Sequence, residues 1–510
     1  MRAPIARLVC LHDVHASPLT YTKPASVRDH VTRASRLASA VAALTAAYHG
    51  RSGVCLLPHG FDAFSTRVHS ARLAQTSIDV QTYIWRDDAT GRFIARELLL
   101  AADRGVRVRV LIDDMDARPR DLALAALDAH PNIDVRVFNP FRTRSGLLRT
   151  IAELSQRGKR LNHRMHNKSW IVDRAIAISG GRNLGNEYFA SAESMNFIDL
   201  DVLMLGPAVE KTAREFDAYW NCSLAVSIAH LRKYSRRTID PAKYRLRLEQ
   251  HAREAMAAEY ARMLDEQNGL TVLLDRRYVW SADVRVVADH PSKALGAGSI
   301  ASHVLDSMVE EIRAASREVL LISPYFVPGM GGTAALRSLA LQGANVEVLT
   351  NSLAATDVAV VHSGYAKYRR PLLEAGVRIY ELKAAAVIDE HPSRFRVGSS
   401  RASLHTKAAV IDAERVFVGS FNIDPRSAEL NCEMGVWVRS AALAQELALR
   451  FREGTHPLRA FELQVTPDGK LTWIDRDGDA MHVHHREPHA SSWRRAISKI
   501  LGALPIESLL

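Results

Sequence analysis

The chain has 510 residues, 47% of them hydrophobic and 24% charged, which is typical of a globular protein with room for more than one domain. A net charge of +11 and a pI near 9.6 exclude an acidic protein overall and favour an anionic partner, either nucleic acid or an acidic lipid surface. No stretch is long and apolar enough for a transmembrane helix, and residues 1–37 lack the apolar core of a signal peptide.

Helices and strands alternate in the first part of the chain, after an extension at residues 1–50 that contains no motif. Apolar residues three or four apart predict helices, and alternating apolar residues predict strands. The predicted order is a helix at 62–75, a strand at 77–85, a helix at 93–104, and strands at 106–113 and 133–138. This alternation indicates an α/β layer fold.

One motif follows these elements and occurs twice in the chain. The first copy reads His166-Asn-Lys-Ser-Trp-Ile-Val-Asp173 and is followed by Gly-Gly-Arg-Asn183. The second reads His405-Thr-Lys-Ala-Ala-Val-Ile-Asp412 and is followed by Gly-Ser-Phe-Asn422. Both fit the pattern HxKx4Dx6G[GS]xN. Because side chains in a strand alternate, His and Lys of each copy are predicted on the same face.

The paired histidines and lysines suit chemistry at phosphorus. A histidine can attack phosphorus or donate a proton near neutral pH, and a lysine beside it is a positive charge for phosphoryl oxygens. Two facing sets would supply a nucleophile, a general acid and two lysines around one phosphate, without a metal or other cofactor. One copy alone could be an accident of a solvated strand, but two long copies argue against that. The predicted catalytic residues are His166, Lys168, Asp173, His405, Lys407 and Asp412.

Other polar residues near the two copies have weaker predicted roles. The amides and hydroxyl of Asn183, Ser420 and Asn422 could bind the same phosphoryl oxygens. Asp173 and Asp412 lie seven residues after the histidines and outside the same-face run, so we expect them to fix the following turn or bind a lysine.

Two acidic residues are predicted to orient the histidines. A strand is predicted at 197–204 after the first copy and another at 433–438 after the second. Aligning the two strands puts Asp199 opposite Glu433, where each carboxylate could hold the second nitrogen of a histidine ring. The alternative is a surface acid at a strand edge.

A nearly constant offset shows that the whole unit is duplicated. His405 follows His166 by 239 residues, and the strand beginning at Val346 follows that near Val108 by 238. Each copy holds one histidine, so the site must lie between two copies of one α/β unit. Cys432, near the second copy, is interpreted as a small packed residue, and the four cysteines show neither zinc spacing nor a disulfide framework.

The remaining segments carry less information about chemistry. Residues 207–298 are predicted to be a charged helical connection against the outside of the units. A hairpin is predicted from strands at 461–465 and 471–474, followed by a histidine-rich segment, 482–489, interpreted as a solvated loop rather than a metal site. A last helix beginning near Ser492 has an apolar stripe and basic neighbours, which suits either a membrane interface or packing on the protein itself.

These motifs resemble those of the phospholipase D superfamily, and more closely those of bacterial cardiolipin synthases of the C type. The matching segments run from about residue 62 to residue 510. They read HNKSWIVD, GGRNLGNEYF, SPYFVP, TNSLAATDVAVVHSGYAKYR, GSFNIDPRSAELNCE and LPIESLL. The resemblance implies that Asp199 and Glu433 orient histidines and that the loop at 350–357 belongs to the rim of the site.

The resemblance also implies the fold and the domain organisation. We expect two duplicated phospholipase D-type α/β units with mixed sheets, packed as a pseudo-twofold dimer within one chain. The expected divisions are an extension at 1–50, a first unit at 51–206, a helical connection at 207–298, a second unit at 299–456, and a hairpin with an amphipathic tail at 457–510.

The activity implied is a phosphatidyl transferase that forms cardiolipin through a covalent phosphohistidine, with His166 as the nucleophile and His405 as the acid. The implied partners are anionic phospholipids such as phosphatidylglycerol and a membrane surface, with nucleic acid less favoured, and the implied location is peripheral on the bacterial cell membrane. A hydrolytic phospholipase D and a nuclease or other phosphodiesterase of the superfamily are the alternatives. Two intact HxK sets argue against a non-enzymatic binding protein, and the donor, the acceptor and the oligomeric state stay open.

Overall fold

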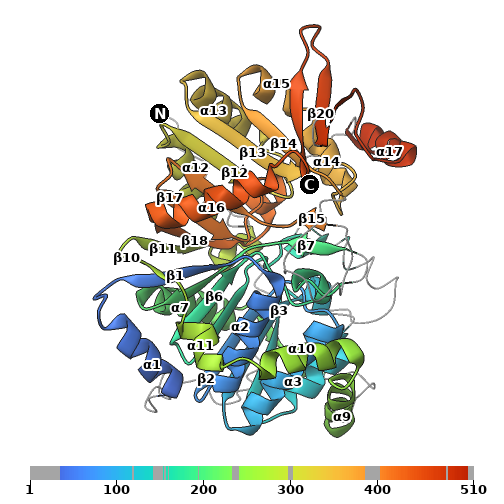
Figure 1. The fold of residues 1–510 in the computed structure, drawn as a ribbon. Coiled ribbons are helices and arrows are strands. Elements are labelled where there is room, and N and C mark those ends of the chain that lie inside the picture. Colours follow the sequence, from blue (N-terminus) through green and yellow to red (C-terminus); the bar gives the residue numbers. More distant parts are fainter. Residues whose placement is uncertain are drawn as a thin grey trace, which may run out of the picture. The chain divides into compact units, whose positions relative to one another are not determined.

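We describe the protein from a computed structural model (Figure 1). The structure describes residues 35–117, 120–141, 160–192, 195–232, 240–296, 303–384, 402–477 and 480–502, together with residues 153, 155, 157 and 158. The first 34 residues of the predicted extension and the terminal segment LPIESLL lie outside this part.

The first unit is built on a mixed sheet of nine strands, as far as the described residues go. In spatial order they are β10 (Val279–Ser281), β1 (Ser52–Leu57), β8 (Asp201–Leu205), β6 (Ile176–Gly180), β5 (Ser169–Val172), β2 (Ser77–Thr82), β3 (Arg107–Asp113), β4 (Ile133–Phe138) and β9 (Ala225–Ser227). Strands β2, β3 and β4 are parallel, whereas the other neighbours in the sheet are antiparallel.

The second unit repeats this arrangement in a sheet of ten described strands. Their order is β11 (Val284–Ala288), β18 (Met434–Arg439), β17 (Arg415–Gly419), β16 (Ala408–Ile411), β12 (Glu318–Ile322), β13 (Asn345–Asn351), β14 (Arg378–Leu382), β19 (Ala460–Val465), β20 (Leu471–Asp477) and β21 (Ala480–His484). The run from β18 to β14 matches the run from β8 to β4 in order and direction, with β12, β13 and β14 parallel. The predicted duplication of a mixed α/β unit is confirmed.

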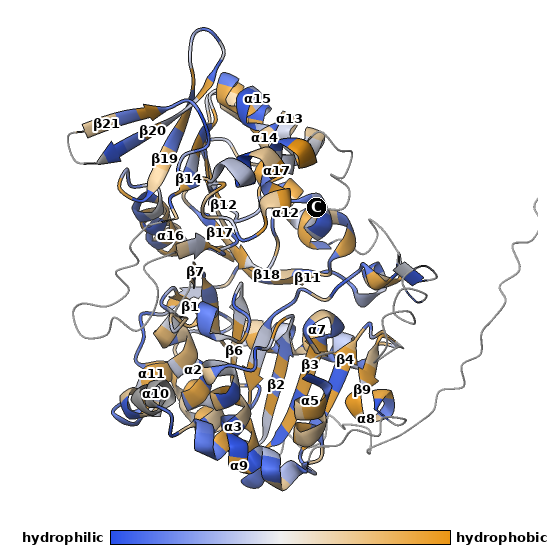
Figure 2. Cartoon of the chain, turned by 90° about the vertical axis from the view of Figure 1, so that its right-hand side faces the viewer, coloured by the Kyte–Doolittle hydropathy of each residue, from blue (hydrophilic) through white to orange (hydrophobic). Residues whose placement is uncertain are grey.

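Helices cover both faces of each sheet (Figure 2). Most strands carry apolar residues on both sides, so both faces must be shielded from water. One core lies between the first sheet and a layer made of α1 (Arg36–Thr45), α2 (Gly60–Leu73), α3 (Ala89–Asp103), α5 (Asp121–Asp128), α9 (Pro241–His251), α10 (Ala255–Asp265) and α11 (Gly269–Leu274). A second core lies between the other sheet and α12 (His303–Arg313), α13 (Gly329–Leu341), α14 (Ala359–Ala366) and α15 (Arg369–Glu374).

A third core joins the two units. It combines the remaining faces of both sheets with α7 (Pro207–Asn221) and α16 (Ala441–Gly454), the helices that follow β8 and β18. The helices α7 and α16 occupy equivalent places in the two units, so each unit contributes one helix and one face of its sheet to the shared core. Short elements complete the described chain: α4 (Asp114–Ala117), α8 (Ile228–Leu231), α17 (Ser492–Gly502), the 3-10 helices Asn186–Tyr188 and Pro291–Leu295, and a π-helical turn, Arg426–Leu430. Within the described residues, no helix is both long and apolar enough to cross a bilayer.

Three predicted segments differ from the structure. In the connection at 207–298, helices α9, α10 and α11 lie on the outside of the first unit, but α7 lies in the core shared by the two units. The connection also holds β9, β10 and β11, and only residues 282 and 283 separate an edge strand of one sheet from an edge strand of the other. The predicted strand at 197–204 is two strands, β7 (Asn196–Ile198) and β8, because the apolar alternation continues while the backbone changes partners. The first part of the histidine-rich segment is not a loop, since β21 extends to His484.

Candidate active site

The two HxK motifs lie just before β5 and β16, and each is held by the backbone of the other unit. The N–H of His166 donates to the carbonyl of Cys432 at 2.8 Å, and the N–H of His405 donates to the carbonyl of Ile198 at 2.8 Å. The segment before His405, β15 (Ala402–Leu404), pairs with β7 of the first unit. Backbone pairing therefore fixes the two motifs against each other before any side chain is considered.

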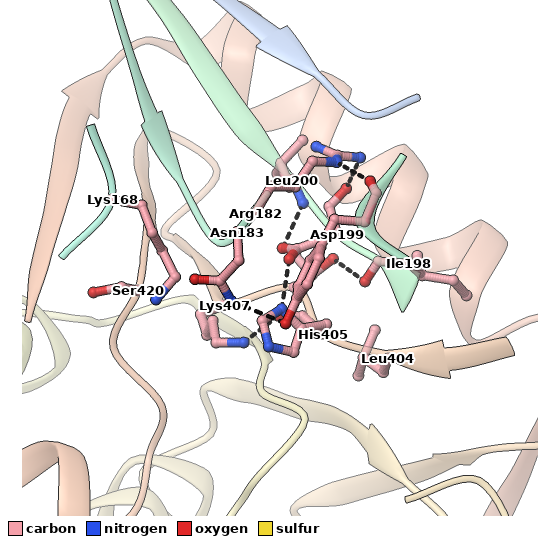
Figure 3. Close-up of polar contacts among 12 residues, drawn as sticks. Lys168, Arg182, Asn183, Ile198, Asp199, Leu200, Leu404, His405, Lys407 and Ser420 are labelled. Carbon is pink, nitrogen blue, oxygen red and sulfur yellow. Dashed lines mark hydrogen bonds and ion pairs between the residues drawn. The ribbon is translucent and has the colours of Figure 1, made fainter. Parts of the chain in front are cut away.

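Both histidines line one cavity of about 590 Å³ at this junction. The two lysines lie behind them, and the Nζ atoms of Lys168 and Lys407 donate to the carbonyls of His166 and His405, at 2.6 and 2.5 Å. Figure 3 shows Lys168, Lys407 and His405 gathered in one place although they come from different units. The structure therefore brings together the four basic side chains that the sequence predicted.

Each histidine ring is bound by an acid from the opposite unit. Nδ1 of His405 lies 2.5 Å from Oδ2 of Asp199, and Nδ1 of His166 lies 2.8 Å from Oε2 of Glu433. All four side chains are buried. With Nδ1 occupied, Nε2 is the ring nitrogen left for a substrate.

The residues after each motif make room for these acids. Gly181 lies against Asp199, and a Cβ atom at Gly181 would be only 2.1 Å from Oδ1 of the carboxylate. The equivalent Ser420 instead uses its hydroxyl, which donates to Oε2 of Glu433 at 2.5 Å. The backbone of Asp199 is further fixed by the buried Arg182, whose Nη2 donates to its carbonyl at 2.6 Å (Figure 3).

Burial and like charge set the protonation of the site. Burial lowers the pKa of His166 to about 4, Glu433 opposes this shift, and the charges of Lys168 and Lys407 add to it. Burial also lowers the pKa of Lys168 to about 7 and of Lys407 to about 8, against the opposing carboxylates. Near neutral pH the site therefore offers an unprotonated His166 beside lysines that readily gain charge when an anion enters.

The carboxylates respond in the opposite direction. Burial alone would raise the pKa values of Asp199 and Glu433, but the histidines together with Lys407, Lys168 and the other groups around the acids outweigh burial, so both pKa values lie below their usual range. Both acids are therefore ionised near neutral pH, and each can stabilise a positive charge on the ring that it holds.

Comparison with known proteins agrees with this geometry. The family model described as "Cardiolipin synthase, PLD-like domain" matches residues 68–220 and 308–454. Cardiolipin synthase C of Escherichia coli (strain K12) is 40% identical over 484 residues, which span 93% of this chain and all of that protein. The chain belongs to the cardiolipin synthase family of phospholipase D-like proteins.

More distant relatives of this family member are consistent with the assignment. An uncharacterised protein of Helicobacter pylori (strain ATCC 700392 / 26695) is 33% identical over 90% of this chain and 89% of its own length. In fold, the crystal structure of phosphatidylserine synthase from Haemophilus influenzae Rd KW20 is similar, with a TM-score of 0.55 and 13% identity over 83% of this chain and 92% of that one. The predicted family and fold class are confirmed.

The motif aspartates of this family member are not among the residues that line the cavity, and their place among the catalytic residues stays a prediction. Asp173 sits at the opposite end of β5 from Lys168, and its carboxylate accepts hydrogen bonds from the backbone of residues 75–77 at 2.8–3.2 Å. Asp412 binds the backbone of residues 316–318 in the same way. Both residues have positive φ, 50° and 55°. Each therefore fixes a turn and the start of β2 or β12, and within the part of the chain that the structure describes neither contacts a lysine.

The three predicted phosphate-binding residues differ in whether their polar atoms are already hydrogen-bonded within the protein. The hydroxyl of Ser420 donates to Glu433 and so holds the acid, while its predicted binding of phosphate stays a prediction. Asn183 donates to the hydroxyl of Tyr188 at 2.9 Å and accepts from the N–H of Ile84 at 3.1 Å. Asn422 lines the cavity, and its buried Oδ1 has no partner among the described residues.

The cavity wall contains residues that the sequence reasoning did not assign. Rings of Tyr83 and Tyr188 pack edge-on against His166 and His405, with centroids 5.1 and 5.3 Å apart. The end of the loop predicted at the rim contributes Asp357, which accepts a hydrogen bond from the Tyr325 hydroxyl at 2.8 Å. The wall also includes Phe197, Val358, Val361, Asp424, Arg426 and Asn431. Asp424 and Arg426 follow Asn422 of the second motif by two and four residues, and that proximity in sequence was the available signal.

Proposed function

We propose that the protein is a phosphatidyl transferase that joins two phospholipids into cardiolipin through a covalent phosphohistidine. The observation that carries the proposal is the pair of histidines in one cavity, each bound at Nδ1 by a carboxylate and backed by a buried lysine. A transferase that works in two displacements needs a nucleophile and a proton donor on opposite sides of one phosphorus. The 40% identity to cardiolipin synthase C supports the same reaction.

In the first step, the Nε2 lone pair of His166 attacks the donor phosphorus. The bond from phosphorus to the headgroup oxygen breaks, and protonated His405 gives its proton to that oxygen, so the alcohol leaves. In the second step, neutral His405 takes the proton from the acceptor hydroxyl, whose oxygen attacks phosphorus while the bond to His166 breaks. Lys168 and Lys407 stabilise the phosphoryl oxygens in both steps.

The assignment of His405 as the acid requires it to be protonated when the donor is bound. Burial and Lys407 lower the pKa of His405 in the free protein, and Asp199 opposes them. A phosphodiester in the cavity brings a negative charge beside the ring, which raises the pKa of His405. Substrate binding therefore supplies the condition for proton donation.

An alcohol rather than water is the proposed acceptor. Asp357 and Asp424 line the cavity with the histidines, and carboxylates repel phosphate but accept hydrogen bonds from hydroxyl groups. Burial raises the pKa of Asp424 to about 7, so this residue can both donate to and accept from a hydroxyl near neutral pH. These groups suit the glycerol headgroup of phosphatidylglycerol, an anionic lipid of the bacterial cell membrane, to which we propose that the protein binds peripherally.

Mass spectrometry of lipid products tests the proposal. Purified protein with phosphatidylglycerol, alone or mixed with phosphatidylethanolamine, should form cardiolipin and release the headgroup alcohol, and His166→Ala and His405→Ala should each abolish turnover. Rapid quenching in denaturing detergent at neutral pH, which spares the acid-labile P–N bond, should trap a lipid-linked histidine on the wild-type protein and none on His166→Ala. Phosphatidic acid as the sole product would favour a hydrolase, and cleavage of plasmid DNA without lipid turnover would favour a nuclease; either result would overturn the proposal.

A further inference from the structure

The helix α17 (Ser492–Gly502) carries apolar residues on two sides. Ile497 and Leu501 are half-buried, and the helix packs against α14 (Figures 1 and 2). Trp493 and Ile500 are 72% and 64% exposed, and their spacing of seven residues places them on one face together with the exposed Ala496. Both environments predicted for this helix are therefore possible: one side packs on the protein, and the other side is exposed and could contact a membrane.

The exposed face is held firmly in place. Nη2 of Arg494 donates to the carbonyl of Thr356 at 2.7 Å, and Nη1 of Arg495 donates to the carbonyl of Glu487 at 3.2 Å. The carboxylate of Glu487 in turn accepts from Nη1 of the buried Arg369 at 2.7 Å. These contacts tie α17 and the segment before it to the second unit.

The charge of α17 indicates which kind of partner suits its exposed apolar face. Residues 492–502 contain three basic side chains, Arg494, Arg495 and Lys499, and no acidic one. Basic side chains beside a short apolar stripe with a tryptophan suit the headgroup layer of an anionic bilayer. A second copy of the same helix would bring three positive charges against three, which disfavours self-association through this face.

The helix lies at the rim of the cavity that contains the histidines. Thr356, which accepts from Arg494, directly precedes Asp357 and Val358, and both of these line the cavity. Val361 of α14 lines it as well. We propose that α17 is the surface that docks on an anionic phospholipid bilayer and sets the cavity beside its lipids. The inference deepens the proposed function, because it names the route by which that site reaches its substrate.

Vesicle binding by the full-length protein tests the proposal. The probe is a vesicle of phosphatidylethanolamine with phosphatidylglycerol, compared with one of phosphatidylcholine alone. The double variant Trp493→Ala/Ile500→Ala should bind the anionic vesicles at least about tenfold more weakly, because both side chains leave water on docking. Lys499→Glu should weaken binding by roughly tenfold at low salt and less at high salt. The matched control is Leu341→Ala/Leu449→Ala, two residues that are 71% and 60% exposed on α13 and α16, and it should bind as the wild type does.

Tryptophan fluorescence gives a second, independent measurement. The seven tryptophans all lie in the described part of the chain, and Trp493 alone is exposed. Brominated lipids should therefore quench the wild-type emission on vesicle binding, and the quenching should be lost in Trp493→Phe, which keeps the apolar surface. Absence of quenching in the wild type, or equal binding by wild type and double variant, would overturn the proposal.

Activity on two forms of substrate separates this inference from the proposed reaction. On a soluble short-chain phosphatidylglycerol below its micelle concentration, the double variant should keep wild-type turnover, whereas on vesicles its rate should fall with its binding. Loss of turnover on both forms would overturn the docking role. So would a wild type that is dimeric in solution and a double variant that is monomeric, because the exposed face would then be a contact between two copies of the chain. Vesicle binding through α17 without any lipid turnover would leave docking intact and reject the transferase.

Discussion

The Nδ1 atom of His405 lies 2.5 Å from Oδ2 of Asp199, although the two residues belong to different units and are 206 positions apart. The reciprocal pair, His166 and Glu433, is separated by 267 positions and has a contact of 2.8 Å. Each unit therefore contributes a histidine to the site and the acid for the other unit's histidine. An isolated unit would lack the acid that holds its histidine, so the second unit completes the first unit's histidine as well as adding its own.

Removing the charge of either acid should lower the rate and leave substrate binding nearly intact. In Asp199→Asn and Glu433→Gln the amide no longer stabilises a charged imidazole, and it can hold the ring in the wrong tautomer. We expect kcat to fall by about 10²-fold or more, with KM changed by less than about threefold. Steady-state kinetics on short-chain phosphatidylglycerol measures both constants.

The surface variant Asp265→Asn is the control for these two acids. Asp265 forms an exposed ion pair with Arg72 and is not among the residues that line the cavity. The variant should keep wild-type kinetics. A wild-type kcat in either Asp199→Asn or Glu433→Gln, in a protein of normal melting temperature, would show that the crossed contacts do not act in the reaction.

A methyl group at Gly181 should impair the same pair indirectly. Its Cβ would approach Oδ1 of Asp199 to 2.1 Å, so the carboxylate must move and the contact with His405 lengthens. We expect Gly181→Ala to lower kcat at least about tenfold while the protein stays folded. Gly331→Ala is the matched control, because nothing lies within 4 Å of that Cβ position on α13. Kinetics and circular dichroism of both variants, with similar spectra and a difference in kcat, would agree with the expectation; equal kcat values would contradict it.

The pH dependence should follow His405 and the lysines on the alkaline side. With a pKa of about 4, His166 is neutral above that pH, so kcat/KM should rise through about pH 4. His405 must be protonated to act as the acid, and its pKa in the free protein lies below its ordinary value, so kcat/KM should begin to fall as this ring loses its proton. Lys168 and Lys407, with pKa values of about 7 and 8, lose their charge through this range and should steepen the fall. The alkaline limb of kcat should lie at higher pH, because the bound phosphodiester raises both lysine pKa values.

Initial rates across pH 4–10 with a soluble phospholipid check this profile, since its phosphodiester does not titrate in the range. A kcat/KM value that stays level from pH 6 to pH 10 would show that neither lysine changes charge in the free protein. Identical alkaline limbs in kcat and kcat/KM would show that the substrate charge does not reach them.

The sequence predicted the components of the site better than their connections. His166, Lys168, His405 and Lys407 follow from a repeated pattern, and the near-constant offset places the two units in one fold. The pairing of Asp199 with His405 could not be predicted, because an internal repeat aligns equivalent residues but does not say whether a contact is made within a unit or across units. The crossed contacts are set by β7 pairing with β15, and the sequence of β7 and β8 reads as a single strand.

Local sequence patterns also do not predict which polar side chains are already hydrogen-bonded within the protein. Ser420 and Asn422 look equally suited to bind phosphate, and only the three-dimensional arrangement shows that the Ser420 hydroxyl is committed to Glu433. Likewise, the amphipathic pattern of the last helix fits two environments, and packing against α14 decides which of its apolar residues remain open. Periodicity identifies faces, but the partners of those faces depend on long-range packing.

The aspartates of the two motifs should affect stability and leave catalysis unchanged. Asp173 accepts hydrogen bonds from three backbone N–H groups and the hydroxyl of Thr76, and Asp173→Ala leaves these donors without a partner. We expect the free energy of unfolding to fall by about 2–3 kcal/mol, because hydrogen bonds to a charged group are the stronger kind. The kcat of the folded variant should stay within about twofold of wild type. Denaturant unfolding and kinetics on the same preparations measure both quantities.

The equivalent change, Asp412→Ala, adds a pH signature. Burial alone would raise the pKa of Asp412, but the backbone donors of residues 316–318 and the charge of Arg415 outweigh it and hold the pKa below its usual value. A depressed pKa contributes stability that is complete above the unfolded-state value of about 4 and is lost as the pH falls through the folded-state value. The stability difference between wild type and Asp412→Ala should therefore be constant from pH 7 to about pH 5 and shrink below about pH 4. A kcat reduced by 10²-fold in Asp173→Ala or Asp412→Ala, at unchanged stability, would show that these residues act in catalysis.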